Sequence, residues 1–260
     1  MAWNPEHYLR FGSERTQPSI DLVNRIELSV PASIVDIGCG PGNSTNVLRQ
    51  RWPEARITGI DNSPEMIERA RTAYPDATWL LAGARDLAPE PQFDLVFSNA
   101  VIQWIPDHDE LIPRLLAIVN PGGALAVQVP LYFDMPVSAA VTATSRRPRW
   151  RDRMRDCDAD LTHLDMHRYY DLLADRAARI VTWQTWYAHE MESHEAIVDM
   201  IRSTGMRPFL ERLYSDDERD AFASEVVEVV REAYPAQRNG RVLFPFKRLF
   251  FVAYAESGSH

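Results

Sequence analysis

Five short apolar runs, separated by helical patterns and turn signals, give residues 33–130 a regular alternation of strand and helix. The runs are Ile34–Ile37, Arg56–Ile60, Thr78–Leu81, Phe93–Ser98 and Ala124–Val129. Strands that are apolar at nearly every position, alternating with helices, predict a parallel sheet covered on both faces. Ligands bind such sheets beyond the carboxyl ends of the strands, so the loops found there are the ones to examine for chemistry.

The loop after the first strand is rich in glycine: Asp36-Ile37-Gly38-Cys39-Gly40-Pro41-Gly42. Without Cβ atoms, backbone in such a loop can approach a ligand closely. Asp61 ends the second strand, 19 residues after Gly42, which is the spacing at which an acid binds ribose hydroxyls. A tight turn without a ligand is the alternative, but the order of strand, loop, helix, strand and acid favours a nucleotide site.

The loop also differs from a dinucleotide fingerprint, because its glycines follow G-x-G-x-G rather than G-x-G-x-x-G. Asp36 stands inside the strand just before it. A carboxylate there would repel phosphate, whereas it can help to orient a cationic aminoalkyl group.

The pattern changes after Pro130. Residues 131–178 are helical in tendency, Arg179–His189 and Val242–Tyr254 are typical of strands, and His194–Thr204 and Asp216–Ala233 are typical of helices. No repeat or low-complexity linker divides the chain. We therefore expect one domain over residues 1–256, with a tail at 257–260. Its expected parts are an N-terminal segment (1–30), a core (33–130), a helical insertion (131–178) and C-terminal strands and helices (179–256).

Composition narrows the class of protein. The 28 basic and 37 acidic residues give a net charge of −9, which is unfavourable for binding nucleic acid. Two cysteines cannot form a disulfide framework, and no histidine or carboxylate spacing suggests a metal site. With neither a long apolar run nor a signal peptide, we expect a cytoplasmic protein without a membrane partner. Lys247 is the single lysine, and the predominance of arginine, although compatible with genomic bias, suits an acidic ligand.

Four segments carry a family resemblance: Val35–Gly42, Gly59–Ser63, Phe93–Val96 and Asn120–Gly123. Together they resemble the class I S-adenosylmethionine-dependent methyltransferases over residues 33–130. The resemblance implies an α/β, Rossmann-like sheet that is mostly parallel, with an antiparallel last strand and flanking helices. It also implies an N-terminal lid and a helical insertion after the fifth strand.

A narrower resemblance, to the trans-aconitate methyltransferase family, extends over nearly the whole chain. It rests on Trp3–Pro5 with Tyr8, and on Ser98–Trp104, Ser203–Leu210 and Gly240–Pro245. It implies methyl transfer from S-adenosylmethionine to one carboxylate of trans-aconitate, giving a monomethyl ester and S-adenosylhomocysteine.

The resemblance also implies a set of cofactor-binding residues: Asp36, Gly38, Cys39, Gly40, Gly42, Asp61, Asn62, Ala84, Arg85 and Asn99. Asp61 would bind the ribose diol and Asn62 would flank the adenine. The chain departs from the family at Gly83, where many relatives carry an acid beside the adenine. Backbone of Ala84 and Arg85, or Asp86, is then expected to replace that contact. We expect Cys39 to be a packing residue rather than a nucleophile.

A carboxylate is ionised at neutral pH, so its methylation needs no general base, and we assign no catalytic residue. The protein must align the reacting atoms, exclude water and neutralise the remaining carboxylates, for which arginine is suited. The expected substrate-binding residues are Tyr8, Arg15, Trp104, Tyr132 and Arg241. Arg248 and the arginines between Arg146 and Arg155 are further candidates, although the cluster is also typical of a solvated helix face paired with Asp152, Asp156 and Asp158. Trp183, Trp186 and Tyr187 are typical of core.

Other functions remain open at this stage. They are a methyltransferase with a different small-molecule acceptor, a nucleotide-binding protein without catalysis, and a nicotinamide oxidoreductase. A neutral hydroxyl or amine acceptor would call for a base near the methyl group, and the sequence offers no obvious one. We expect a monomer that binds a small polycarboxylate.

Overall fold

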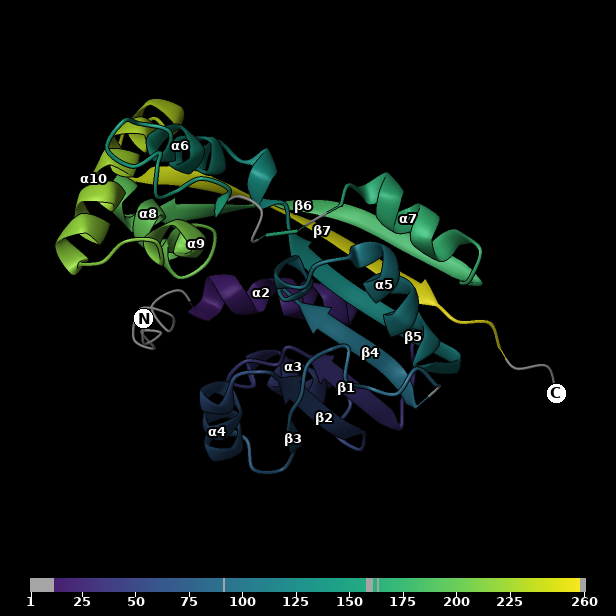
Figure 1. Ribbon diagram of the computed structural model, residues 1–260. Helices are drawn as coiled ribbons and strands as arrows, with labels where there is room; N and C mark the ends of the chain where they lie inside the picture. Colours follow the sequence, from purple (N-terminus) through teal and green to yellow (C-terminus); the bar gives the residue numbers. More distant parts are fainter. Residues whose placement is uncertain (1–11, 91, 158–160, 163, 258–260) are drawn as a thin grey trace. The chain divides into compact units, whose positions relative to one another are not determined.

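The computed structural model describes residues 12–257 apart from 91, 158–160 and 163. The chain divides into two compact units (Figure 1). Unit 2 contains Arg15–Val129, Thr162–Gln184 and the chain from Leu249 onward. Unit 1 contains Pro130–Leu161 and Thr185–Arg248. The division of residues 1–256 into functional segments within one domain stays a prediction.

Seven strands form one sheet in the order β3-β2-β1-β4-β5-β7-β6. They are β1 (Ser33–Ile37), β2 (Arg56–Asp61), β3 (Thr78–Leu81), β4 (Phe93–Asn99), β5 (Val119–Pro130), β6 (Arg179–Met191) and β7 (Val242–Tyr254). The first five pair in parallel and β7 is antiparallel. The predicted α/β Rossmann-like sheet is thereby confirmed.

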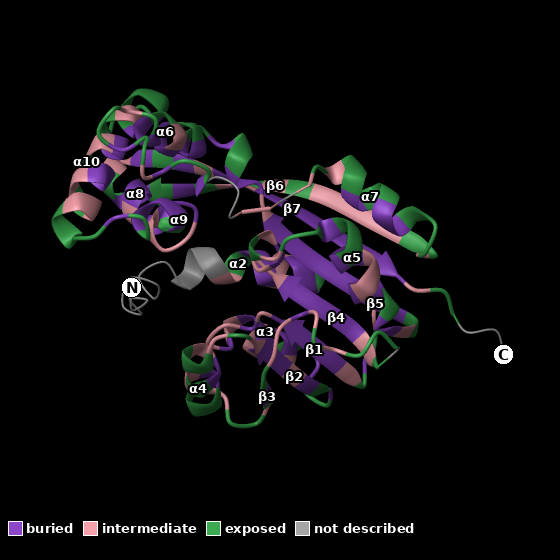
Figure 2. Cartoon of the chain, in the orientation of Figure 1, coloured by how far each residue is buried: buried purple, intermediate pink, exposed green. Residues whose placement is uncertain are grey.

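The centre of the sheet is its most buried part. Ile34 and Val35 of β1, and Leu95, Val96 and Phe97 of β4, have no exposed surface. Figure 2 shows the same two strands as almost continuously buried. This explains the unbroken apolar runs in the sequence, because helices cover both faces of a parallel sheet.

Helices and short 3-10 turns connect the strands. They are α2 (Gly12–Asn24), α3 (Asn43–Arg51), α4 (Pro64–Ala73), η1 (Ile102–Trp104), α5 (His108–Ala117), η2 (Tyr132–Asp134), α6 (Pro136–Ser145), α7 (Met166–Ala174), α8 (His194–Arg202), α9 (Arg207–Leu210) and α10 (Asp216–Ala233). Local chemistry sets where they begin. Ser63 caps α4 by accepting a hydrogen bond from the Met66 N–H, and Pro64 is the first helical residue. Within the described part of the chain, no helix combines the length and apolarity that a membrane crossing requires.

β5 begins earlier than the apolar run suggested, at Val119 rather than Ala124. The Asn-Pro-Gly-Gly segment is extended because it pairs with the chain that follows β7. Gly122 N–H donates to Glu256 O at 2.9 Å, and Ala255 N–H donates to Gly123 O at 2.9 Å.

In unit 1, α10 packs against α6 and α8. The core there includes Trp150 and Phe222, whose ring centroids lie 5.5 Å apart. The arginine cluster does not form the expected helix face, since residues 146–156 form turns and bends. Arg147 binds Glu225 at 2.8 Å and Arg153 binds Glu218 at 3.0 Å, and both glutamates lie on α10.

The core interpretation of Trp186 is wrong, because that side chain is 57% exposed. Trp183 is half-buried and stacks on Phe250, with 4.9 Å between ring centroids. Successive side chains of a strand point to opposite faces, so Trp186 lies on the exposed face of β6, opposite the partly buried Trp183 and Tyr187. The presence of aromatic residues in a strand does not by itself reveal which face is packed.

Candidate cofactor site

The glycine loop between β1 and α3 holds three glycines in the left-handed region, with φ of 65° at Gly38, 53° at Gly40 and 95° at Gly42. A Cβ built on Gly38 would lie 2.3 Å from a methyl group of Val101, so the chain packs tightly there. At Gly40 no atom of the described residues lies within 4 Å of the corresponding position. The same backbone conformation therefore serves packing at one glycine and leaves room for a ligand at the other.

Asp61 is fixed at the carboxyl end of β2. Its Oδ2 accepts a hydrogen bond from Gly40 N–H at 3.0 Å, and its Oδ1 accepts one from Ser63 N–H at 2.9 Å. The residue is partly exposed. A carboxylate oxygen can accept more than one hydrogen bond, so both oxygens keep capacity for a diol.

Asp36 is fully buried at the end of β1. Its Oδ2 accepts hydrogen bonds from the hydroxyls of Ser44 (2.7 Å) and Thr45 (2.6 Å) on α3. Its Oδ1 accepts none from the described residues. Burial raises the pKa of Asp36 to about 6, and this effect outweighs the two hydroxyl hydrogen bonds, which lower the pKa. At neutral pH the group is a carboxylate whose free oxygen favours a cation with N–H donors.

Cys39 packs in a small cluster with Ile67, Ala70 and Trp79. Burial raises the pKa of its thiol, and the nearby carboxylates of Asp36 and Asp61 raise it further. A thiol held in its neutral form is a poor nucleophile, which agrees with a packing role.

The loop after β3 is held by a different set of contacts. Gly83 N–H donates to a carboxylate oxygen of Asp86 at 2.7 Å, so this acid bonds the backbone of the loop that departs from the family pattern. Ala84 is buried and Asn62 is exposed.

The Arg85 side chain points toward the start of α5. It donates to Pro106 O at 2.7 Å and lies 3.3 Å from Glu110 Oε2. Arg114 in turn donates to the carbonyl oxygens of Arg85 and Leu87. The guanidinium of Arg85 is therefore engaged with protein, which leaves its backbone as the part able to meet an adenine.

The segment after β4 carries Asn99 and Trp104. Ala100 has a φ of 58°, and its N–H donates to Gln128 O at 3.0 Å. The side-chain oxygens of Asn99 and Gln103 are buried and accept no hydrogen bond from the described residues. Trp104 is 36% exposed.

His108, which no motif of the sequence marks, is buried beneath this segment and bonds its backbone. His108 Nε2 lies 2.8 Å from Ile102 O, and Nδ1 lies 2.8 Å from the Tyr169 hydroxyl on α7. Burial lowers the pKa of His108 and raises that of Tyr169. A neutral imidazole that donates from Nε2 and accepts at Nδ1 satisfies both contacts. The pair is 61 residues apart in sequence, and spacing alone gave no signal for it.

The expected substrate residues fall in different parts of the structure. Tyr8 lies outside the described residues, and Arg15 is on α2. Trp104 belongs to unit 2, whereas Tyr132 and Arg241 belong to unit 1. Arg241 lies 3.8 Å from Glu190 and 3.9 Å from Glu192. Tyr132 is buried against Gly205.

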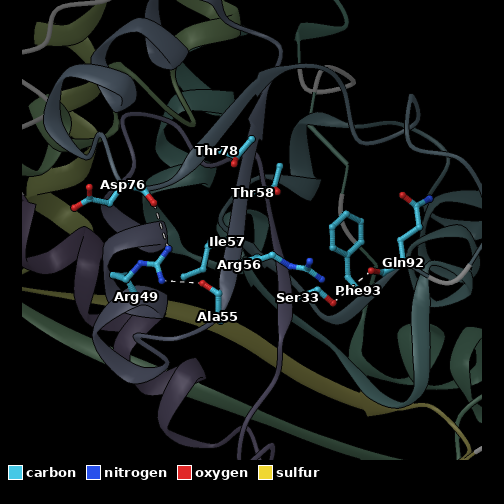
Figure 3. A pocket seen from close by; sticks show the side chains of 10 residues that line it. All are labelled: Ser33, Arg49, Ala55, Arg56, Ile57, Thr58, Asp76, Thr78, Gln92 and Phe93. Carbon is cyan, nitrogen blue, oxygen red and sulfur yellow. Dashed lines mark hydrogen bonds between the residues drawn. The ribbon is translucent and has the colours of Figure 1, made fainter.

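A groove of about 430 Å³ lies at the opposite end of the sheet (Figure 3). Its lining includes Ser33, Arg56, Thr78 and Phe93, which are the first residues of β1 to β4. Since parallel sheets bind ligands at the carboxyl ends of their strands, this groove is not the expected cofactor site. No cluster of three or more metal-binding side chains occurs among the residues that the structure describes.

The residues at the carboxyl end fit a nucleoside with a cationic side chain. Among the described residues, none fills the space beside Gly40 and none donates a hydrogen bond to the buried Oδ1 of Asp36, while Asp61 offers a fixed carboxylate. These are the features expected for S-adenosylmethionine.

Comparisons with known proteins agree. Residues 34–123 match a family described as a methyltransferase domain. The chain is 43% identical over 251 residues to trans-aconitate 2-methyltransferase of Escherichia coli O157:H7, covering 96% of this chain and 97% of that protein. The enzyme of the same name from Shigella flexneri gives the same identity and coverage.

Solved structures support the fold. YcgJ from Bacillus subtilis superposes with a TM-score of 0.56 at 14% identity, covering 93% of this chain and 100% of that one. Phosphoethanolamine N-methyltransferase 2 of Haemonchus contortus, solved with S-adenosyl-L-methionine, gives 0.55 at 15% identity, over 93% of this chain and 53% of that one. The chain therefore belongs to the class I S-adenosylmethionine-dependent methyltransferases, as a homologue of trans-aconitate 2-methyltransferase over nearly its whole length.

Proposed function

We propose that this methyltransferase esterifies one carboxylate of trans-aconitate, or of a close tricarboxylic acid, in the cytoplasm. The observation that carries the proposal is the 43% identity to trans-aconitate 2-methyltransferase over 96% of the chain. The products would be a monomethyl ester and S-adenosylhomocysteine. A monomeric state stays a prediction.

S-adenosylmethionine supplies an activated methyl group on a positively charged sulfur. In the transfer, a bond forms between a carboxylate oxygen and the methyl carbon while the bond between that carbon and sulfur breaks. The carboxylate is already ionised near neutral pH. No proton has to be removed, so the protein's task is alignment and exclusion of water.

We assign cofactor binding to the carboxyl ends of β1, β2 and β4. Asp61 would hold the ribose diol, Asp36 and Asn99 would meet the methionine part, and the backbone of Ala84 and Arg85 would approach the adenine. The glycine loop would line the methionine part. The hydrogen bonds to Asp61 and the open space at Gly40 support these assignments.

We assign acceptor binding to Tyr8, Arg15, Trp104, Tyr132 and Arg241. A tricarboxylate needs its remaining charges neutralised, and arginine does this with two parallel hydrogen bonds. Arg241 suits the task because its contacts to Glu190 and Glu192, at 3.8 and 3.9 Å, are long and exposed. Such pairs are weak, so a substrate carboxylate can replace them.

The first experiment incubates the protein with S-adenosylmethionine and a panel of di- and tricarboxylic acids, read by mass spectrometry. The expected product is trans-aconitate with one added methyl group that mild base removes. Binding of cofactor without methylation of any acid would contradict the proposed acceptor substrate. It would still agree with membership of the methyltransferase family.

Arg241→Ala tests the acceptor site. Its expected effect is a rise in KM for the acid by about tenfold or more, corresponding to one lost charged hydrogen-bond pair, with unchanged cofactor affinity. Arg238→Ala is the matched control, because Arg238 is exposed on the same loop. An unchanged KM in Arg241→Ala would remove Arg241 from the acceptor site.

A further inference from the structure

Gln103 presents a buried oxygen whose direction the structure fixes. Its Nε2 donates to Ala100 O at 2.7 Å. A carbonyl oxygen can only accept, so the amide must turn its NH2 toward Ala100 and its Oε1 away from it. That oxygen accepts no hydrogen bond from the described residues. The backbone is held as well, since Thr162 N–H donates to Gln103 O at 2.8 Å.

Two further side-chain oxygens in this part of the structure are also buried without a hydrogen-bond donor among the described residues. Asn99 Oδ1 and Asp36 Oδ1 are buried and accept no hydrogen bond from the described residues. Asn99 ends β4 and is joined to Ala100, the residue that Gln103 binds. Asp36 is on β1 opposite Phe97 of β4. Asp36 on β1, Asn99 at the end of β4 and Gln103 on η1 thus each carry a buried oxygen that accepts no hydrogen bond from the described residues.

The chemistry of these acceptors selects their ligand. A buried acceptor without a donor is unfavourable, so these oxygens favour a ligand with N–H or O–H groups. A tricarboxylic acid at neutral pH carries only acceptor oxygens and negative charge, which the Asp36 carboxylate repels. An ammonium group offers three N–H donors and a positive charge.

The order of the strands indicates which end of the cofactor meets them. This step rests on the proposed function, in which Asp61 of β2 holds the ribose and the loop after β3 approaches the adenine. The sheet order is β3-β2-β1-β4. In this order the adenine lies at the end of β3 and the ribose at the end of β2, so the amino-acid end of the cofactor lies at the ends of β1 and β4.

We propose that Gln103 is a cofactor-binding residue whose Oε1 accepts a hydrogen bond from the ammonium group of S-adenosylmethionine. It completes an acceptor set with Asp36 and Asn99, and the hydrogen bond to Ala100 orients it for this role.

The test measures binding by titration calorimetry with two probes. S-adenosylhomocysteine carries the ammonium, whereas 5′-methylthioadenosine has the same nucleoside and thioether without the amino-acid part. Gln103→Met is expected to weaken the binding of S-adenosylhomocysteine by about tenfold or more. The same variant should weaken the binding of 5′-methylthioadenosine by less than about twofold. Gln92→Met makes the same chemical change at the other end of the sheet, where Figure 3 shows Gln92, and should alter neither.

Equal weakening of both probes would mean that the loop has lost its structure, and no weakening would mean that Gln103 does not meet the ammonium. Either result overturns the proposal. Should the methionine variant fail to fold, Gln103→Asn withdraws the amide by one methylene and should show the same selective loss. A wild-type protein that binds neither probe would instead refute the cofactor assignment of the proposed function.

Discussion

The aromatic ring of Tyr132 fills the space that a side chain at Gly205 would need. A Cβ built on Gly205 would lie 2.3 Å from Cε2 of Tyr132. Tyr132 is the first residue of η2, separated from the end of β5 by one residue, and Gly205 lies in the turn after α8. The Ser203–Leu210 segment, which carries part of the narrower resemblance, therefore has a structural task, namely to seat a tyrosine that we assign to acceptor binding.

Gly205→Ala should destabilise the fold by about 1–3 kcal/mol, because the added methyl group overpacks against the ring. Urea unfolding measures the change. Tyr132→Leu introduced into the alanine variant should restore part of the loss. An alanine variant as stable as the wild type would contradict the contact.

Gly40→Ala and Gly38→Ala should separate ligand binding from folding. Both substitutions carry about 1–2 kcal/mol of left-handed backbone strain. Gly38→Ala adds a clash with Val101, whereas the Cβ of Gly40→Ala enters open space. We expect the larger loss of stability at Gly38 and a loss of S-adenosylhomocysteine binding in Gly40→Ala even where the protein is fully folded. Normal binding in folded Gly40→Ala would show that the open space is not used.

Asp61→Ala should weaken cofactor binding by on the order of 1–3 kcal/mol, because hydrogen bonds to the ribose are lost. It also leaves the Gly40 and Ser63 N–H groups without their acceptor. Calorimetric titration with S-adenosylhomocysteine gives the value. Asp76→Ala, at an exposed position near the amino end of β3, is the control. Equal affinities in both variants would place the ribose elsewhere.

Asp36→Asn should alter the pH dependence of stability. The pKa of Asp36 is raised from 3.8 to about 6 by burial, so between pH 4 and 6 the folded protein keeps a proton that the unfolded chain has lost. Wild-type stability therefore falls as pH rises through that window, by about 3 kcal/mol at most. The asparagine variant lacks this fall, and urea unfolding at pH 4 and pH 7 measures the difference.

Asp36→Asn should also weaken the binding of S-adenosylhomocysteine at pH 7, because the variant lacks the negative charge that faces the ammonium group. In the wild type, affinity should rise with pH through about 6 as Asp36 ionises. Parallel pH profiles of binding in wild type and variant would be inconsistent with a role for that charge.

Local features of the sequence predicted the fold well. Apolar runs of the right length gave the strands of unit 2, and Ser63 with Pro64 gave the start of α4. The glycine loop and Asp61 lie at neighbouring strand ends, because the carboxyl ends of parallel strands share an edge. Each of these inferences depends on residues close in sequence or on the known geometry of a parallel sheet.

Contacts between distant residues were the ones that the sequence could not show. The partners of Arg147 and Arg153 lie on α10, more than 60 residues away. Tyr169 contacts His108 across 61 residues of sequence. Gln103 stood out only once its side-chain oxygen proved to accept no hydrogen bond from the described residues. A charge or an amide in a sequence has many possible partners, and only the folded chain selects one.

Both β6 and β7 pass from one compact unit into the other, since β6 crosses the division after Gln184 and β7 after Arg248. Neither unit can be cut from the chain without severing two hydrogen-bonded strands in mid-course. The two units should therefore melt together in a single cooperative transition, and protease nicking in the connecting loops should not release an independently folded fragment.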